Sequence, residues 1–225
     1  MNLKLTIAFL FPFFLFAQNN ENKKRNNKKP NDVRWVTQSL EYESICAQTY
    51  SSAYIALERQ IKSTNRPVII MDIDETVLDN SQYQVELFLQ QKEYNSRSWD
   101  KWVLKEAAEL VPGAKNFILK YKQNPNSRII YLSNRSAATL EATKNNMRKL
   151  GIYFENDIFL LRENNEDTKV IRRNEVMSGA GRMQKYGPLK ILAYFGDAMG
   201  DFPLGGGYEF ARNKFIFPNP MYGKW

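Results

Sequence analysis

The chain has 225 residues, of which 43% are hydrophobic and 25% are charged, values typical of one globular domain with a full core. Its formal net charge of +8 is concentrated at the amino terminus, because residues 1–30 contain six Lys or Arg and one Glu, which leaves +3 for residues 31–225. This distribution does not favour a nucleic-acid polymer as partner. The sequence contains no histidine, which excludes a histidine nucleophile, base or metal ligand and leaves proton transfer to carboxylates, Lys or Tyr.

The amino-terminal segment predicts export followed by a linker. Residues 1–17 combine a positive start, an apolar run at Leu5–Phe16 and a small residue at Ala17, which is the pattern of a cleaved signal peptide. The run is too short to span a bilayer stably, and no Cys directly follows it for lipid attachment. We expect a periplasmic or secreted protein with at most peripheral membrane association; a retained anchor is the alternative. Residues 18–31 are polar and basic and are predicted to be a disordered linker.

One long helix is predicted over residues 32–62. Apolar residues such as Val36, Leu40 and Leu57 recur there at helical spacings. The single cysteine, Cys46, lies within this pattern and can form no internal disulfide, so we expect it to be a small core residue.

The next segment, Pro67–Asn80, joins a predicted strand to an acidic turn. Pro67–Met71 is a short apolar run rich in β-branched residues, which indicates a buried strand. Asp72 and Asp74 follow it, and in an extended chain their side chains lie on the same side. They come where a parallel strand would end, at the edge where open α/β sheets bind ligands. A polar turn that caps the next helix is the alternative for this motif alone.

Residues 81–112 are predicted to form a helical insertion. One helix is expected over Ser81–Gln91 and a second over Trp99–Glu109, with Ser98 as its cap and Trp102 in the core. The segment is too long for an ordinary βα loop. We therefore expect a small cap that stands over the carboxyl ends of the strands and selects what enters the site.

After Gly113, helices and strands alternate. Further helices are predicted at Phe117–Tyr121, Ala138–Leu150 and, with an interruption, Thr168–Lys185. Further strands are predicted at Arg128–Leu132, Ile158–Leu161, Ile191–Phe195 and Phe215–Phe217. This alternation predicts an α/β fold with a Rossmann-like parallel sheet and helices on both faces.

Polar residues stand at the predicted carboxyl ends of four strands. They are Asp72 and Asp74, Ser133, Lys169 at the start of the helix after the third strand, and Asp197 and Asp201. Because the carboxyl ends of parallel strands meet at one edge, we expect these side chains to form one site. Oxygen ligands without His or Cys favour Mg²⁺ as the metal. Unrelated turn and cap residues at each position are the alternative, but four such clusters at the same end of one sheet are hard to obtain by chance.

Several longer motifs extend this pattern. They are Asp72–Asn80, Trp99–Val103, Val111–Ala114, Leu132–Arg135, Gly196–Phe202 and Pro218–Gly223. Together they resemble the class C, or DDDD, bacterial acid phosphatases of the haloacid dehalogenase-like (HAD-like) superfamily, which include outer-membrane 5′-nucleotidases. The resemblance runs from about Arg34 to Trp225. It implies a HAD-like phosphatase domain over residues 32–225, with a small helical cap and a long N-terminal helix, and it leaves room for a homodimer.

The resemblance also implies a reaction. The protein would be a Mg²⁺-dependent acid phosphatase that hydrolyses small phosphomonoesters, such as 5′-nucleotides, through an aspartyl-phosphate. Asp72 would be the nucleophile and Asp74 the acid and base. The metal would be held by the side chains of Asp72 and Asp197 and by the backbone carbonyl of Asp74, with Asp201 as a ligand or an orienting residue.

Substrate-binding residues follow from the same resemblance. Ser133 and Asn134 would contact the substrate, with the Ser133 hydroxyl on a phosphoryl oxygen, and Lys169 would stabilise the charge there. Trp99 and Tyr222 match aromatic positions near the leaving group, where an aromatic face could stack on a nucleobase; a core position for Trp99 stays open.

Three points of the sequence leave alternatives open. The last acidic motif reads Gly-Asp-Ala-Met-Gly-Asp at 196–201, where the family more often has Gly-Asp-Asn-Leu-Asp-Asp. Arg172 and Arg173 are alternatives to Lys169 as the phosphate-binding cation. Two other functions also remain, a phosphatase for non-nucleotide esters such as sugar phosphates and a non-catalytic binding or storage protein on the same fold.

Overall fold

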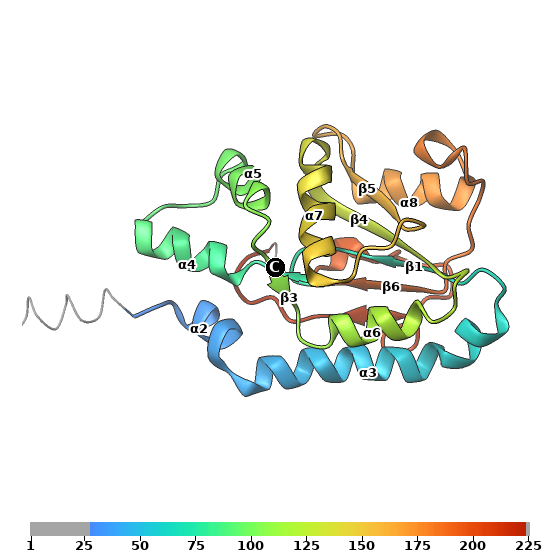
Figure 1. The fold of residues 1–225 in the computed structure, drawn as a ribbon, viewed down its shortest axis with the longest axis horizontal. Coiled ribbons are helices and arrows are strands. Elements are labelled where there is room, and N and C mark those ends of the chain that lie inside the picture. Colours follow the sequence, from blue (N-terminus) through green and yellow to red (C-terminus); the bar gives the residue numbers. More distant parts are fainter. Residues whose placement is uncertain (1–27, 224–225) are drawn as a thin grey trace, which may run out of the picture.

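The computed structural model describes residues 28–223 of the chain (Figure 1). The predicted signal peptide, residues 1–17, and most of the predicted linker, residues 18–31, lie outside the described residues, so both stay predictions. The first helix, α2, spans Asn31–Gln38 and therefore includes the last residue assigned to the linker. Within residues 28–223, none of the helices is long and apolar enough to cross a bilayer.

A five-stranded parallel sheet lies at the centre, with the strand order β5-β4-β1-β6-β7. The strands are β1 (Val68–Met71), β4 (Arg128–Ser136), β5 (Ile158–Arg162), β6 (Ala193–Gly196) and β7 (Lys214–Ile216). All four residues of β1 are buried, because the strand pairs on both edges and is covered on both faces, which explains its continuous apolar sequence. The predicted α/β fold with a parallel sheet is confirmed.

Helices cover both faces of this sheet (Figure 1). They are α3 (Leu40–Ser63), α6 (Ala114–Tyr121) and α7 (Leu140–Leu150) on one face, and α8 (Lys169–Ser178) on the other. In β1, Ile69 and Met71 pack in the first layer, and Val68 and Ile70 pack in the second, as the two-residue period of a strand requires. Cys46 is fully buried in the first layer, as predicted.

The single helix predicted over residues 32–62 is wrong, because the chain forms two helices there. α2 ends at Gln38 and α3 begins at Leu40, since the backbone of Ser39 is extended. The Ser39 hydroxyl accepts a hydrogen bond from the backbone N–H of Tyr42 at 3.0 Å and so caps α3. The apolar spacing continues across Ser39, so it predicts one helix and gives no sign that the serine side chain caps a new one.

The cap stands beyond the carboxyl end of β1 (Figure 1). It consists of α4 (Ser81–Gln90), α5 (Ser96–Leu104) and a two-stranded antiparallel ribbon of β2 (Leu78–Asp79) and β3 (Glu109–Leu110). The predicted limits of α5 are wrong at both ends. The residue that caps the amino terminus of α5 is Asn95, whose side-chain oxygen accepts a hydrogen bond from the Ser98 N–H at 2.9 Å. The helix ends at Leu104, and Glu109, which the sequence placed in the helix, instead pairs with Asp79 in the ribbon.

Candidate active site

Three of the predicted acidic residues meet at the carboxyl edge of the sheet. Asp72 directly follows β1, Asp197 directly follows β6, and Asp201 ends the short 3-10 helix η3 (Met199–Asp201). One carboxylate oxygen of each residue lies within 4.8 Å of the others. Asp72 and Asp201 are only 6% and 5% exposed, so like charges are held together with little water between them. Such an arrangement is stabilised by a cation.

The turn after β1 is fixed from two sides. Glu75 has a φ of 53°, a backbone conformation that few non-glycine residues adopt, and its side chain accepts a hydrogen bond from the backbone N–H of Asn80 at 2.9 Å. On the other side, the hydroxyl of Tyr50 in α3 donates a hydrogen bond to the backbone carbonyl of Thr76. These contacts hold a strained turn in place, and the turn sets the direction of the two aspartates before it.

Gly196 makes room for Asp201. A Cβ atom at position 196 would lie 2.3 Å from the Cβ of Asp201, a distance that no side chain tolerates. The Asp201 carboxylate folds back over the strand end and accepts a hydrogen bond from the Ala198 N–H at 3.0 Å. The glycine in the Gly-Asp-x-x-x-Asp motif is therefore required by packing.

Lys169 lies within the same cluster. It is the first residue of α8, and its Nζ is 2.7 Å from Oδ1 of Asp72 and donates a hydrogen bond to Asp201. Burial acts to lower the pKa of the Lys169 amine, but the charges of Asp72 and Asp201 outweigh it and raise the pKa above its ordinary value. The amine therefore stays charged and can neutralise a phosphoryl oxygen.

Two arginines of α8 hold the loops of the site and do not join the cluster. Arg172 is fully buried and donates to the backbone carbonyl of Ser133 and, at 2.7 Å, to the side-chain oxygen of Asn134. Arg173 donates to the carbonyl of Gly200 at 2.7 Å. Of the three cations considered for the phosphate, the structure brings only Lys169 to the carboxylates.

The Asp74 side chain points to a separate set of partners. Its Oδ1 accepts hydrogen bonds from Nε and Nη2 of Arg135, at 2.9 and 2.8 Å, and from Nδ2 of Asn80, at 2.9 Å. Its Oδ2 accepts from the hydroxyl of Ser133 at 3.3 Å. Asp74 and Ser133 are therefore neighbours, as the sequence predicted, but Asp74 is not one of the three clustered carboxylates.

Sequence reasoning assigned no role to Arg135 or Asn80, nor to Asn219. The amide of Asn219 donates to Oδ2 of Asp197 at 2.8 Å. Burial raises the pKa of Asp197 to about 6, with Asp201 acting in the same direction and Asn219 against it. Asn80, Arg135 and Asn219 all lie inside the motifs that carried the family resemblance. Membership in those motifs was the signal in the sequence that could have pointed to them.

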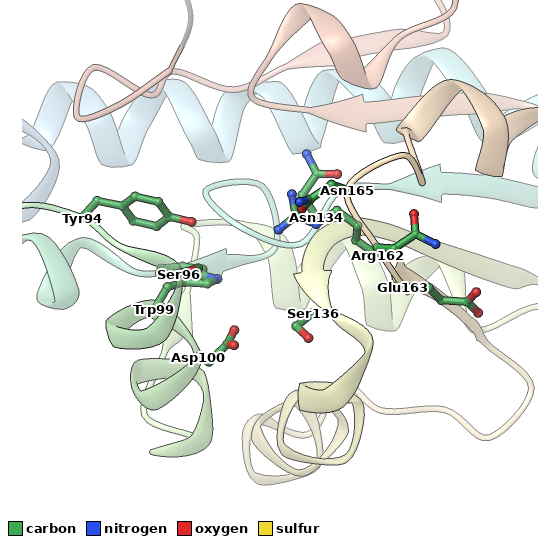
Figure 2. A pocket seen from close by; sticks show the side chains of 10 residues that line it. Tyr94, Ser96, Trp99, Asp100, Asn134, Ser136, Arg162, Glu163 and Asn165 are labelled. Carbon is green, nitrogen blue, oxygen red and sulfur yellow. The ribbon is translucent and has the colours of Figure 1, made fainter.

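A cavity of about 250 Å³ lies between the cap and the carboxyl end of β4, and Asn134, the neighbour of Ser133 in the sequence, is among its lining residues (Figure 2). Its lining comes from the cap, from the end of β4, and from the end of β5 with the loop that follows it: Tyr94, Ser96, Trp99, Asp100, Asn134, Ser136, Arg162, Glu163, Asn164 and Asn165. Trp99 packs edge-on against Tyr83, with ring centroids 5.2 Å apart, and is partly exposed to the cavity. Trp102 is 3% exposed and belongs to the core, as predicted.

Of the predicted substrate-binding residues, Asn134 and Trp99 line this cavity, Lys169 and Ser133 contact the aspartates instead, and Tyr222 does neither in the described contacts. Tyr222 is half-buried in the C-terminal segment and is not among the described residues that line the cavity. Its contact with a substrate stays a prediction.

Comparisons with known proteins agree with this geometry. The family model of the HAD superfamily, subfamily IIIB (acid phosphatase), matches residues 16–225. The class C acid phosphatase from Bacillus anthracis with tungstate bound is 31% identical, with a TM-score of 0.71 over 85% of this chain and 84% of that chain. A second structure of the class C acid phosphatase from the same organism is 29% identical, with a TM-score of 0.69 and the same coverage. The family resemblance is confirmed: the chain belongs to the HAD superfamily, subfamily IIIB of acid phosphatases, and is a phosphomonoesterase.

Proposed function

We propose that the protein is a Mg²⁺-dependent acid phosphatase that hydrolyses small phosphomonoesters, among them 5′-nucleotides, through an aspartyl-phosphate. The observation that carries this proposal is the meeting of Asp72, Asp197, Asp201 and Lys169 at one buried edge of the sheet. A carboxylate nucleophile repels a phosphate dianion, so a site that uses one requires positive charge. Lys169 supplies one such charge, and the excess of carboxylates would hold a metal cation that supplies more.

The carboxylates fit a divalent metal with oxygen ligands. Asp72, Asp197 and Asp201 would hold the ion together with the backbone carbonyl of Asp74. Three close carboxylates, without histidine anywhere in the sequence, suit Mg²⁺ better than a softer metal. The clustering of carboxylates also raises the pKa of Asp197, because burial and the neighbouring Asp201 both disfavour its charged form. When bound, the ion would neutralise charge between the phosphate and the nucleophile.

The remaining residues of the site would act on the phosphoryl group. Asp72 would attack phosphorus, and Asp74 would exchange protons with the leaving group and with water. Lys169 and Ser133 would contact the non-bridging oxygens. Asn134 would add a donor, because its side-chain oxygen already accepts a hydrogen bond from Arg172, which leaves the NH₂ group of this exposed side chain to donate.

The cavity under the cap would take the leaving group. Its lining includes Asn134, which follows the proposed phosphate contact Ser133, and the ring of Trp99 (Figure 2). Asp100 and Ser136 add polar atoms to this lining. A nucleoside would match this lining, because its flat base could stack on the Trp99 ring and its sugar hydroxyls could hydrogen-bond to the polar atoms. This supports nucleoside leaving groups, and Tyr222 would be their second aromatic contact.

We also propose that residues 32–225 act as the phosphatase domain after export, with residues 1–17 removed. The proposal includes a protein that is periplasmic or secreted, peripheral to membranes at most, and free to form a homodimer. Mass spectrometry of the mature protein tests the cleavage, and light scattering of the purified protein tests the dimer. A mature chain that retains residues 1–17 would contradict the export proposal.

A substrate panel with and without metal tests the activity. Asp72→Asn should abolish hydrolysis of p-nitrophenyl phosphate, and EDTA should abolish it until Mg²⁺ is restored. Asp32→Asn, a matched change outside the site, should leave the rate unchanged. Full activity of Asp72→Asn would overturn the nucleophile assignment. Turnover of adenosine monophosphate no faster than that of a simple alkyl phosphate would favour non-nucleotide esters, and tight substrate binding without turnover would favour a binding protein.

A further inference from the structure

Arg135 is buried in a position that the proposed chemistry has not used. It is 1% exposed, and its backbone N–H donates to the hydroxyl of Ser133 at 3.1 Å. Its guanidinium donates to Oδ1 of Asp74 through both Nε and Nη2, and to the hydroxyl of Thr143 through Nη1 at 3.1 Å. Burying a guanidinium is costly unless its donors are satisfied, so this arrangement holds both the arginine and the aspartate in one geometry.

The two oxygens of Asp74 are in different environments. Oδ1 accepts three hydrogen bonds within 2.9 Å, two from Arg135 and one from Asn80. Oδ2 accepts one, from Ser133 at 3.3 Å. Three donors occupy the lone pairs of Oδ1, and a proton on that oxygen would face N–H groups that cannot accept it. Oδ2 is therefore the oxygen that can carry a proton.

The cap helix α5 sets the direction of Asn80. The Asn80 side-chain oxygen accepts from Nε1 of Trp102 at 2.8 Å and from Nη2 of Arg135 at 3.3 Å. An indole nitrogen and a guanidinium only donate, so this end of the amide must be its oxygen, and the NH₂ group must face Asp74. A buried residue of the cap thus orients the amide that holds the aspartate.

We propose that Arg135 and Asn80, with Trp102 behind them, are positioning residues that make Oδ2 of Asp74 the proton carrier. This inference rests on the proposed aspartyl-phosphate mechanism. In the first half-reaction, an oxygen of Asp72 bonds to phosphorus, the ester P–O bond breaks, and Oδ2 of Asp74 gives its proton to the leaving oxygen. In the second half-reaction, a water oxygen bonds to phosphorus, Oδ2 takes a proton from that water, and the bond from Asp72 to phosphorus breaks.

The leaving group provides the test. The second-order constant kcat/KM reports the first half-reaction, in which an alkyl alcohol needs the proton and p-nitrophenolate, a stable anion, does not. Arg135→Lys keeps the charge and loses the two-point contact. It should lower kcat/KM for an alkyl phosphate at least about tenfold more than for p-nitrophenyl phosphate, since a positioned general acid contributes about 10²–10⁴-fold. Arg128→Lys, the same change on the same strand at its other end, should leave the ratio of the two constants unchanged.

Two further variants keep the inference falsifiable if Arg135→Lys does not fold. Trp102→Phe keeps the ring and removes the N–H group that orients Asn80, so it should move the ratio in the same direction by a smaller factor. Asp74→Asn gives the largest shift, and adding Arg135→Lys to it should shift the ratio no further. Equal losses on both substrates, or an unchanged ratio in the Trp102 variant, would overturn the inference. Inactivity of Asp72→Asn together with an unmoved ratio would refute this inference alone, whereas full activity of Asp72→Asn would refute the proposed function.

Discussion

Charged side chains are buried at both ends of the strands of the parallel sheet, which we call its amino edge and its carboxyl edge. The two differ in how their charges are balanced. At the amino edge, Nζ of Lys122 lies 2.6 Å from Oδ1 of Asp157, and their side chains are 4% and 0% exposed. Lys122 also donates to the Ser127 carbonyl at 3.1 Å, and Asp157 accepts from the Ile129 N–H at 2.8 Å. One negative charge thus meets one positive charge, and both are hydrogen-bonded to the ends of neighbouring strands.

At the carboxyl edge, within residues 28–223, three clustered carboxylates meet one ammonium group, that of Lys169. Burial raises the pKa of Asp157 while Lys122 opposes the shift, and at the other edge burial raises the pKa of Asp197 while a neighbouring carboxylate, that of Asp201, adds to it. Burial of charge alone therefore does not indicate a reaction centre. An excess of one sign does, because the excess must be neutralised by a ligand.

The largest effect is expected from removing charge at the unbalanced edge. Asp197→Asn should lower kcat/KM by about 10³-fold, because it removes a ligand from the proposed metal site, and a metal there would contribute several kcal/mol to the transition state. Added Mg²⁺ should restore part of the activity, which a titration of rate against metal concentration would measure. Activity equal to that of the unchanged protein at low Mg²⁺ would show that Asp197 does not hold a metal and that the acidic excess at this edge has another role.

The matched change at the balanced edge should affect stability instead. Asp157→Asn leaves Lys122 buried without a counterion, which should lower the free energy of unfolding by about 3 kcal/mol. Urea unfolding measures this loss, and kcat/KM of the folded variant should equal that of the unchanged protein. A large loss of activity at full stability would show that the two edges are not functionally distinct.

A smaller effect is expected from the amide that supports the acidic cluster. Asn219→Ala removes the hydrogen bond to Oδ2 of Asp197 and should weaken Mg²⁺ binding by about tenfold, as loss of such supporting contacts usually does. The affinity can be measured from the Mg²⁺ dependence of the rate. An unchanged metal dependence would mean that Asp197 is oriented by the backbone alone.

The smallest effect concerns a second balanced network, in which Asp167 accepts hydrogen bonds from Arg182 at 2.9 and 3.1 Å. Burial acts to raise the pKa of Asp167, but the hydrogen bond from Arg182 and the charge of Arg172 outweigh it and hold the pKa below its ordinary value. A carboxyl group with a lowered pKa stabilises the fold above its unfolded pKa, and this contribution is lost as the pH falls through the folded pKa. The free energy of unfolding of the unchanged protein should therefore fall as the pH drops below about 4, and Asp167→Asn should make this fall less steep. Urea unfolding at neutral and acidic pH would measure it, and an unaltered pH profile would contradict it.

Some residues of the site followed from the sequence because each stands at the end of a strand that its own local pattern predicts. Asp72 and Asp197 are of this kind, and the parallel pairing of β1 with β6 brings the two strand ends together. The break at Ser39 was also local, but a serine cap gives a weaker signal than the apolar spacing that runs through it.

The fold class, the acidic edge and the absence of histidine chemistry could be predicted from the sequence, because strand ends, residue spacing and composition can be read without knowing how the elements pack. Only the tertiary structure chose among the cations of α8. Lys169 is in the first turn and reaches the carboxylates, whereas Arg172 and Arg173, one turn further along, reach backbone carbonyls instead. Tertiary packing also decided the partners of Asp74, since Arg135 is 61 positions away along the chain and Asn80 is oriented by a cap residue 22 positions further on. Contacts over such separations depend on how the elements pack, which no local pattern records.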